Sequence, residues 1–555
     1  MIYEVSNLAI LIFIFIVGLV LGLSFYFARK TKSASGYYAA GGNIHWGVNG
    51  IAFAGDYLSA ASFLGICGMI AYSGYDGFLY SIGYLAGWVV ALFLVAEPLK
   101  KLGKYTFTDA LDSKFNAKSI KLTASVSTLI VSIFYLIPQM VGAGDLVVPL
   151  LGLPHWMGVV LVGSIVILIV ATAGMTSTTY VQFIKGGLLV VFSTVLTIYI
   201  LNNGLKRNPS PDYHQFTRLD AVMLNDTTPV PLDSAWVFQS VRHSGKNTFV
   251  KLTKDGFEHW FKYETGEKPL LTETLYTTLK EDGTKLYNGA PKTDKRFYQV
   301  GHLNRIVHHG NEVDETGPVG PFEFIKVIES SDVVRFSKAS FTDGTDKVTL
   351  WYPNVTSGKD IMKPGLLYKL TKAQGAGFWD KLNFLSLMLA LFLGTSALPH
   401  ILIRYYTVPS QRAARKSTIV AITAIGFFYI LTLYMGLGAM INGVMDMESS
   451  NMSGPLLAKA FGIGLFSIIS AIAFATVLGT VSGLIVASSG AIAHDFIDKY
   501  LSIPMTDKSK VRAGKISAIA VGVFAILLGI LFKGMNVSFL VGLAFAVAAS
   551  ANLPA

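Results

Sequence analysis

Small polar side chains and one carboxylate interrupt an apolar segment near the start of the chain. The run reads Gly55-Asp56-Tyr57-Leu58-Ser59, and Ser62 follows one turn later. A carboxylate within a membrane-type segment costs roughly 2.5–3.5 kcal/mol on insertion scales, so such a residue is functional by default. Asp56 is therefore a candidate for a cation or proton pathway. The alternative is that its carboxylate caps amide groups freed by the break.

A second interruption, Gly394-Thr395-Ser396-Ala397-Leu398-Pro399, falls in another apolar segment. Where a helix unwinds inside a bilayer, half-helix N-termini attract a carboxylate and free carbonyls attract a cation. Two such breaks together favour a binding site over close packing of small residues, which is the alternative for each residue alone. The residues that we expect to bind a small carboxylate substrate are Ser59, Ala60, Ser62, Gln139, Gly394, Thr395 and Ser396.

Three other polar residues lie in apolar segments. Lys185 follows Tyr180, where a predicted span starts, by only a turn and a half, so snorkelling of its ammonium group toward the membrane surface is favoured. His400 and Gln139 are more often satisfied packing residues than ligands. The single cysteine, Cys67, reads as a buried small hydrophobe and excludes an intrachain disulfide.

The elements that must position these residues are membrane helices. Of the 555 residues, 52% are hydrophobic and 14% are charged, whereas soluble domains carry roughly a quarter charged residues. Eleven apolar spans are predicted at residues 8–27, 47–72, 77–96, 122–151, 157–173, 180–201, 384–405, 419–441, 456–493, 516–532 and from 537 to the end. The lipid bilayer is therefore the main partner.

Basic residues gather in alternate connections between these spans, among them Lys100, Lys101, Arg404, Arg412 and Arg415. The positive-inside rule makes these connections cytoplasmic and places the N-terminus outside. Because the basic residues stand beside apolar spans, the net charge of +11 does not indicate nucleic-acid binding.

Residues 205–357 have a different character, polar and strand-like. Strands are predicted at 249–253, 258–263 and 347–352, and the turns at Asp255-Gly256, Asp282-Gly283 and Asp343-Gly344 are typical of hairpins. We expect a mainly β module on the outer face, where it is open to an extracytoplasmic partner. Its residues His302, His308 and His309 have no Cys, His or carboxylate at a ligand-like spacing, so solvated loop histidines are favoured over a metal site.

Several stretches carry a family resemblance. They are Ser35-Gly36-Tyr37-Tyr38-Ala39-Ala40-Gly41-Gly42-Asn43, Gly55-Asp56-Tyr57-Leu58-Ser59-Ala60-Ala61-Ser62-Phe63-Leu64-Gly65, Gly74-Tyr75-Asp76-Gly77, Gln139-Met140-Val141-Gly142-Ala143-Gly144, Leu398-Pro399-His400-Ile401-Leu402-Ile403-Arg404 and Val541-Gly542-Leu543-Ala544-Phe545-Ala546. The chain resembles the solute:sodium symporter family, and within it the cation/acetate symporter branch. The resemblance covers nearly all of the membrane part and not the polar module.

This resemblance implies an all-α polytopic protein with a leucine-transporter-type fold: two inverted five-helix repeats after one leading helix. Residues 1–204 would hold spans one to six, residues 205–357 the inserted mainly β extracytoplasmic module, and residues 358–555 spans seven to eleven. The chain stops at Asn552-Leu553-Pro554-Ala555, where the family runs on through more spans, so we expect a C-terminal truncation.

The resemblance also implies a sodium site between the second and ninth spans. Its residues, carried over by position, are Gly55, Leu58, Thr476, Gly479 and Thr480. Sodium-coupled members typically have two adjacent hydroxyl residues where this chain has Gly479-Thr480, and they often have Asp at the position of Thr179. Since hard cations prefer oxygen ligands, both departures leave a proton, through Asp56, open as the coupling ion beside sodium.

The sequence as a whole predicts a symporter of the bacterial inner membrane that imports acetate or another short monocarboxylate with Na⁺ or H⁺. No other cofactor is expected. The alternatives are sodium-coupled transport of another small solute, such as proline, pantothenate or a sugar, and a membrane sensor that uses the outer module. An enzyme is not expected, because no nucleophile and base arrangement or metal spacing is present.

Overall fold

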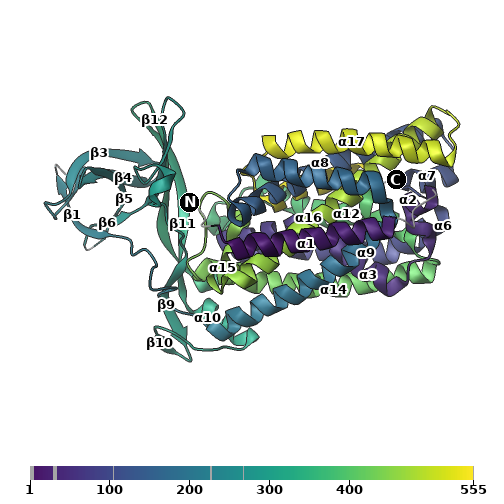
Figure 1. Ribbon diagram of the computed structural model, residues 1–555. Coiled ribbons are helices and arrows are strands. Elements are labelled where there is room, and N and C mark those ends of the chain that lie inside the picture. The colour runs from purple at the N-terminus through teal and green to yellow at the C-terminus, as the bar shows by residue number, and fades with distance from the viewer. Residues whose placement is uncertain (1–4, 29–33, 104, 225–227, 267, 554–555) are drawn as a thin grey trace. The chain divides into compact units, whose positions relative to one another are not determined.

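The computed structural model describes residues 5–28, 34–103, 105–224, 228–266 and 268–553 (Figure 1). Positions 1–4, 554 and 555, at the ends of the expected regions, lie outside the described residues. Two compact units are present. The helical unit contains residues 5–202, 363–438 and 449–553, and the β-module contains Asn203–Met362 and Ala439–Glu448.

Long apolar helices make up the helical unit. They are α1 (Asn7–Ala28), α5 (Tyr75–Val90), α8 (Lys118–Leu151), α9 (His155–Asn203), α12 (Phe378–Thr395), α14 (Gln411–Ile441), α16 (Ile463–Gly490), α17 (Asp507–Leu531) and α18 (Val537–Ala551). Shorter helices join or extend them: α2 (Ala34–Ala39), α3 (Trp46–Tyr57), α4 (Ile66–Ser73), α6 (Ala96–Leu102), α7 (Phe107–Phe115), α13 (Pro399–Leu402) and α15 (Ser453–Ala460).

Each of the eleven predicted spans corresponds to an apolar helix among the described residues. Eight helices are long and apolar enough to cross a membrane, one further span is the bent pair Trp46–Tyr57 and Ala61–Ser73, and two shorter apolar helices cover His155–Val170 and Val537–Ala551. The fifth and sixth predicted spans both lie within α9. A multi-pass membrane protein follows from this pattern.

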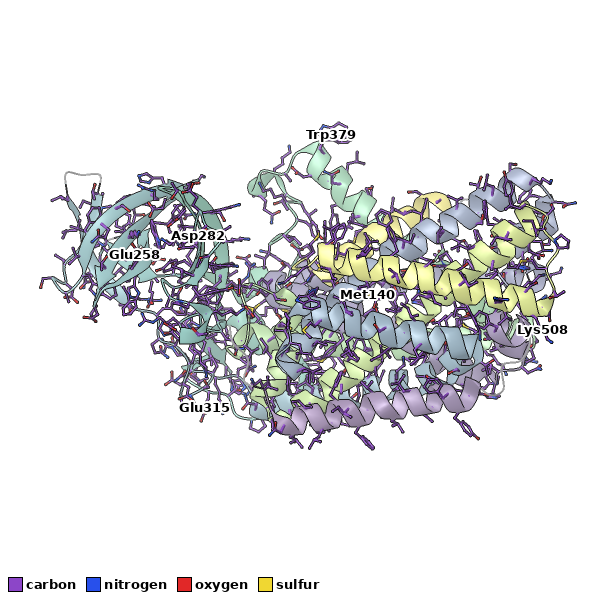
Figure 2. The ribbon with its side chains drawn as sticks, turned by 45° about the horizontal axis from the view of Figure 1, so that its top comes forward. Met140, Glu258, Asp282, Glu315, Trp379 and Lys508 are labelled. Carbon is purple, nitrogen blue, oxygen red and sulfur yellow. The ribbon has the colours of Figure 1, made fainter. Side chains whose placement is uncertain are left out.

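Side-chain burial separates the helices that face lipid from the one at the centre. Leu11, Ile14 and Phe15 of α1 are exposed, as is Trp379 at the start of α12 (Figure 2). Exposed apolar side chains suit a hydrocarbon environment, and an exposed Trp at a helix end suits the membrane interface. In contrast, the span that contains α16 is 94% buried. α16 is therefore the helix against which the others pack.

The first break is a real interruption of the helix. α3 ends at Tyr57, Leu58 leaves the helical conformation with ψ 78°, and a wide turn at Ala61–Gly65 leads into α4. The two halves are bent by 58°. Leu58 and Ser59 form the unwound link between the halves, where Leu58 N–H still donates to the Ala54 carbonyl and the Ser59 carbonyl accepts from Phe63 N–H.

The second break follows α12. Leu398 is extended (φ −77°, ψ 119°), and α13 begins at Pro399. Proline has no N–H and disfavours a helical conformation in the residue before it, which explains why the helix stops here. The Tyr57 hydroxyl lies 3.1 Å from Thr395 Oγ1, so the two breaks meet inside the bundle.

Asp76, in the motif Gly74-Tyr75-Asp76-Gly77, has a structural role. Its carboxylate accepts hydrogen bonds from the backbone N–H groups of Gly365, Leu367 and Tyr368, at 2.5–3.2 Å. One buried acidic side chain thus fixes the segment that precedes α12. Gly74 permits this placement because its φ of +58° is disfavoured for other residues.

Two six-stranded antiparallel sheets form the β-module. The first has the order β2-β1-β6-β5-β4-β3 and the second has the order β10-β9-β11-β12-β7-β8. The strands are β1 (Arg218–Leu224), β2 (Thr228–Pro231), β3 (Val237–Ser244), β4 (Asn247–Lys254), β5 (Phe257–Glu264), β6 (Leu270–Glu273), β7 (Leu275–Leu279), β8 (Lys285–Tyr287), β9 (His302–His308), β10 (Asn311–Val313), β11 (Asp332–Asp343) and β12 (Asp346–Ser357), and the helix α10 (Pro321–Ser330) accompanies them. The three predicted strands and the three Asp-Gly turns are confirmed.

Strand alternation builds two cores in this module. Phe249 and Val250 are neighbours on β4 and point to opposite faces of the sheet, yet both are fully buried. Val250 packs with Trp236 and Phe261. Phe249 packs with Tyr276 and Leu350 of the second sheet. The first sheet is therefore covered on both faces at β4.

Candidate functional site

A buried ion pair lies at the end of α3. Both Arg404 Nε and Nη2 donate to Asp56 Oδ2, at 3.1 and 3.0 Å, and neither side chain is exposed. Arg404 was expected in a cytoplasmic connection, and that expectation is wrong. Its guanidinium turns inward because a buried carboxylate needs a charged, hydrogen-bonded partner.

Two residues of α9 complete this ion pair. Gln182 Nε2 donates to Asp56 Oδ1 at 2.6 Å and lies 3.0 Å from the Gly479 carbonyl oxygen. Thr179 Oγ1 accepts from Arg404 Nη1 at 2.8 Å. Thr179, a candidate for the cation or proton pathway, therefore contacts the arginine that is paired with Asp56. The sequence analysis did not single out Gln182.

One of the predicted cation-binding residues, Thr480, joins α16 to α3. Thr480 Oγ1 donates to the backbone oxygen of Asp56 at 2.6 Å, which brings the ninth span against the break. Thr476 Oγ1 donates to the Ile472 carbonyl within its own helix at 2.7 Å. Both hydroxyl hydrogens are thus directed at backbone oxygens.

Lys185 joins the same cluster from α9. Its side chain is buried, and its Nζ donates to the Ala475 carbonyl at 2.7 Å. The ammonium group does not snorkel to the surface, contrary to expectation. We refer to Asp56, Thr179, Gln182, Lys185 and Arg404 as the charge cluster.

Glycines allow the helices that carry the charge cluster to approach closely. A Cβ on Gly55 would overlap the Gln182 carbonyl, and a Cβ on Gly186 would overlap the Gly55 backbone. Small residues at such crossings are typical of membrane helix pairs. Gly394 has a packing role as well, because a Cβ there would overlap the Phe545 carbonyl of α18.

A second group of polar residues lies on the other side of the break. Gln139 Nε2 donates to Ser59 Oγ at 3.1 Å, while Gln139 Oε1 and both ring nitrogens of His400 have no hydrogen-bond partner among the described residues. Both side chains are fully buried. Tyr135 links them, since its phenol interacts with Ser59 and its ring centroid lies 5.0 Å from that of His400.

Buried polar atoms without partners are costly and rare in native proteins. The Ser59 hydroxyl is held between Gln139 and Tyr135, whereas an uncharged imidazole such as that of His400 has one N–H donor and one acceptor nitrogen. We call Ser59, Tyr135, Gln139 and His400 the open polar group. It offers an imidazole N–H to a small polar ligand beside the N-terminus of the half-helix that begins at Ala61.

Comparison with known proteins identifies the family of the chain. The profile of the sodium:solute symporter family matches residues 37–206 and 335–555. The chain belongs to this family. An uncharacterized symporter of Bacillus subtilis is 34% identical over 553 residues, which cover 98% of this chain and 79% of that protein. A monocarboxylic acid transporter of Corynebacterium glutamicum is 35% identical over 537 residues, covering 95% of this chain and 74% of the relative.

The fold is shared with a solved symporter. A substrate-bound, outward-open Na⁺-coupled sialic acid symporter superposes with a TM-score of 0.56 and 14% identity, over 95% of this chain and 82% of that one. The family profile matches neither residues 207–334 nor most of the two sheets. The gap in the profile match therefore falls on most of the β-module.

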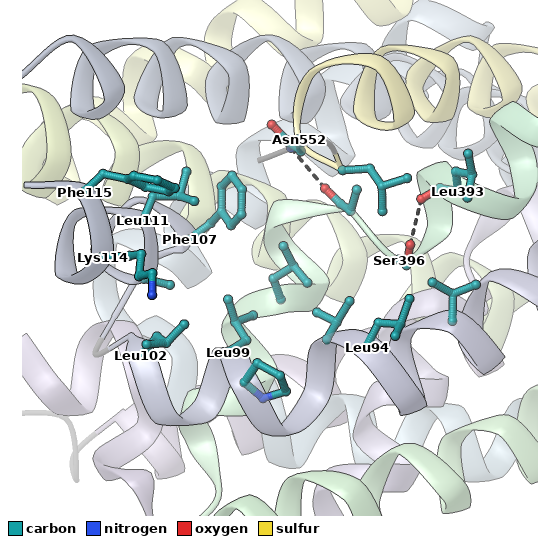
Figure 3. Close-up of a pocket in the computed structure, with 17 residues that line it drawn as sticks. Leu94, Leu99, Leu102, Phe107, Leu111, Lys114, Phe115, Leu393, Ser396 and Asn552 are labelled. Carbon is teal, nitrogen blue, oxygen red and sulfur yellow. Dashed lines mark hydrogen bonds between the residues drawn. The ribbon is translucent and has the colours of Figure 1, made fainter. Parts of the chain in front are cut away.

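The remaining predicted substrate residues of this symporter are divided between two places. Ser62 Oγ lies 3.4 Å from the Tyr429 hydroxyl, and a Cβ on Gly142 would overlap the Cβ of Ala60. These residues, with Thr395, belong to the packed interior around the break. Ser396 instead donates to the Leu393 carbonyl and lines a cavity of about 590 Å³ (Figure 3).

That cavity has an apolar wall. Leu94, Leu99, Phe107 and Leu111 line it, and Asn552 Nδ2 donates to the Ala397 carbonyl at its edge (Figure 3). A desolvated carboxylate gains little from such a surface. Ser396 is thus separated from the open polar group.

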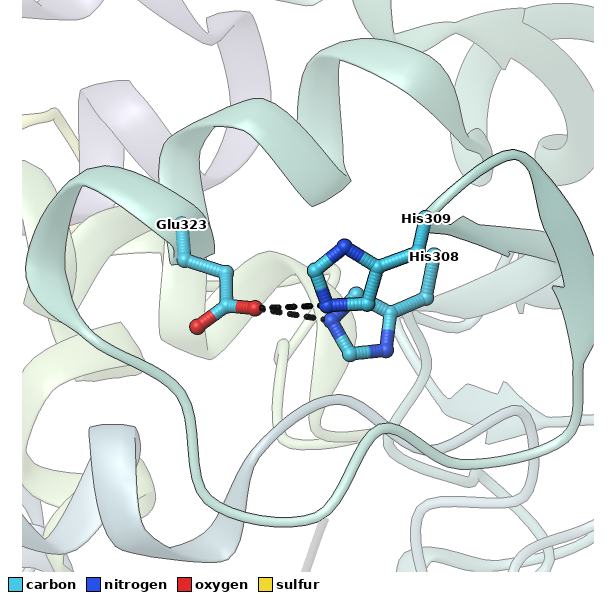
Figure 4. A group of neighbouring side chains, drawn as sticks. All are labelled: His308, His309 and Glu323. Carbon is cyan, nitrogen blue, oxygen red and sulfur yellow. Dashed lines mark hydrogen bonds and ion pairs between the residues drawn. The ribbon is translucent and has the colours of Figure 1, made fainter.

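The β-module contains a histidine pair whose carboxylate partner the sequence analysis missed. Glu323 Oε1 lies 2.9 Å from His308 Nε2 and 3.3 Å from His309 Nε2 (Figure 4). The hydrogen bond with His308 holds the pKa of Glu323 below its usual value. Glu323 stands on α10, so the spacing in sequence gave no sign of it, and the expectation of histidines without a partner is wrong.

Proposed function

We propose that this symporter imports acetate or a similar short monocarboxylate together with a cation, by alternating access. The observation that carries the proposal is the open polar group at a broken helix, in which both ring nitrogens of buried His400 have no partner among the described residues. A carboxylate bound there would receive a hydrogen bond from the His400 N–H and would lie near the positive end of the half-helix. The monocarboxylic acid transporter of Corynebacterium glutamicum supports the same substrate class.

The proposed fold and membrane orientation follow the architecture of the family. We propose two inverted five-helix repeats, α3 to α9 and α12 to α18, whose first helices are the two broken ones. The protein would lie in a bacterial inner membrane with its N-terminus and the β-module outside, and residues 205–357 would form the insertion. The coupling ion is Na⁺ or H⁺.

Voltage constrains the coupling. One monovalent cation that moves with one carboxylate anion is electroneutral, so the membrane potential adds nothing to the driving force. A tenfold cation gradient then supplies about 1.4 kcal/mol, enough for about tenfold accumulation. Greater accumulation requires more than one cation for each substrate.

Solute counterflow tests the substrate class. Proteoliposomes that hold the purified chain are loaded with unlabelled acetate, and labelled acetate is added outside. We expect entry of the label that pyruvate and propionate inhibit and that proline, pantothenate and glucose do not. Entry of labelled proline or glucose, with no effect of monocarboxylates, would contradict the proposal.

A further inference from the structure

The ammonium group of Lys185 lies directly beside the backbone of Gly479. A Cβ at position 479 would overlap Lys185 Nζ, and it would be in tight contact with Gln182 Cγ. The ammonium group therefore stands where the side chain of residue 479 would be. The family resemblance expects a hydroxyl at this position, and this chain has a lysine nitrogen from another helix in its place.

The ammonium group is held there by its surroundings. Nζ donates to the Ala475 carbonyl of α16 at 2.7 Å, and the side chain is only 2% exposed. The charged groups that act on it are Asp56 of α3 and Arg404, which follows α13. The Asp56 carboxylate interacts electrostatically with both cations, and among the described residues it accepts hydrogen bonds from the arginine and Gln182.

The charge at this position decides against sodium. The hydroxyls of Thr476 and Thr480 donate to backbone oxygens and the Gly479 carbonyl accepts from Gln182, so these oxygens keep lone pairs that a cation could use. The Lys185 nitrogen, however, takes the space of a residue 479 side chain, and a sodium ion would be repelled by an ammonium group within contact distance. The residues at this position do not fit a sodium ion.

We infer that the Lys185 ammonium group is the resident cation of the site between α3 and α16, so that this symporter binds no sodium there. A charge fixed to α9 would hold α3, α9 and α16 together in the way that a bound ion would. The inference concerns the ion specificity of the proposed symport, and it is tested by a binding measurement that does not depend on transport.

Thermal unfolding of the purified full chain is measured in sodium chloride and in choline chloride at equal concentration. Ligands that bind only the folded state raise Tm. The wild-type chain should show the same Tm in both salts. The double variant Lys185→Ala with Gly479→Ser removes the ammonium group and restores the missing hydroxyl, and its Tm should rise in sodium chloride.

A matched double variant controls for the composition change. Lys508 is exposed near the start of α17 (Figure 2), and a Cβ on Gly187 would meet nothing within 4 Å. Lys508→Ala with Gly187→Ser should show no sodium response. A sodium-dependent rise in the wild-type Tm, or a folded Lys185→Ala, Gly479→Ser chain that ignores sodium, would overturn the inference.

Transport gives an independent readout on the wild-type chain, should the site variant fail to fold. Acetate counterflow should run at the same rate with sodium or choline as the only salt cation. Counterflow that stops without sodium would overturn the inference and leave the proposed function intact. Absence of counterflow in every medium would overturn the proposed function, and the Tm comparison of the wild-type chain would still decide whether sodium binds.

Discussion

Acidic and basic side chains form ion pairs both in the charge cluster and in the β-module. The pair in the charge cluster is buried, whereas pairs in the β-module are exposed to water. Asp56 and Arg404 are 0% exposed, whereas Lys280 and Asp346, joined at 2.8 Å, are 43% and 22% exposed. Water can replace a lost partner in the second pair and cannot in the first. A charge that is buried in the helical unit therefore needs a permanent partner.

The largest expected loss of stability comes from breaking the buried ion pair of the charge cluster. Asp56→Asn keeps the shape of the side chain and leaves the buried Arg404 guanidinium without a counter-charge. We expect a loss of about 3–5 kcal/mol of stability, the usual result of breaking a buried pair. Thermal unfolding in detergent and the yield of folded chain measure it. A Tm equal to that of the wild type would show that the cluster is hydrated like the surface pairs.

The titration of His302 in the β-module should change stability by an intermediate amount. Burial, with Arg218 and Arg207 nearby, lowers the pKa of His302 to about 4, and Tyr213 lies 2.8 Å from its Nδ1. Between about pH 6.5 and 4 the unfolded chain binds a proton that the folded chain does not, so stability falls as the pH falls, by up to about 3 kcal/mol.

Tryptophan fluorescence follows this loss, because Trp236, Trp260 and Trp351 all lie in the module. Melting at pH 7 and at pH 4.5 should show a lower transition in acid. His302→Gln should reduce the difference. An identical acid shift in that variant would assign the pH dependence to other groups.

The open polar group should respond differently from the charge cluster. Gln139→Leu removes the unpartnered oxygen and the bond to Ser59, and it introduces no unpaired charge. If a carboxylate binds here, loss of the bond that positions Ser59 weakens apparent affinity by about 2–10-fold, since a hydrogen bond between neutral groups contributes about 0.5–1.5 kcal/mol. The apparent KM of acetate counterflow measures it.

Ser488→Ala is the control for Gln139→Leu, because this buried serine donates only to the Leu484 carbonyl of its own helix. Its KM should match the wild type. An unchanged KM in Gln139→Leu would place the substrate elsewhere in the bundle.

The smallest effect is expected for the exposed pair. Asp346→Asn removes the partner of Lys280 on a surface where water replaces it, so stability should change by about 1 kcal/mol or less. Chemical unfolding of the module, followed by fluorescence, measures the change. A loss as large as that of Asp56→Asn would remove the contrast between the two regions.

The sequence predicted the helices better than it predicted their contacts. Hydropathy located the apolar spans, and the glycine, serine and proline residues located both breaks, because these signals are local. Asp-Gly turns likewise located three hairpins. The charge cluster joins residues up to 348 positions apart, and no local pattern encodes such a contact.

Two residues of the charge cluster did carry a usable signal. Arg404 lies inside the span predicted at 384–405, where a cation requires a buried partner, and Asp56 has the opposite charge. Lys185 was assigned to the membrane surface because Tyr180 was taken as the start of its span. The helix α9 runs from His155 to Asn203, so Tyr180 is not a helix end, and the Lys185 side chain is buried inside the bundle.

Concentrative uptake tests the central claim most directly. Labelled acetate is supplied to proteoliposomes under an inward proton gradient in sodium-free medium, under an inward sodium gradient at equal pH, and with no gradient. Coupled import of a monocarboxylate predicts that internal acetate rises above the external concentration under at least one cation gradient and falls back when an ionophore collapses it. Simple equilibration of acetate under all three conditions would contradict the account.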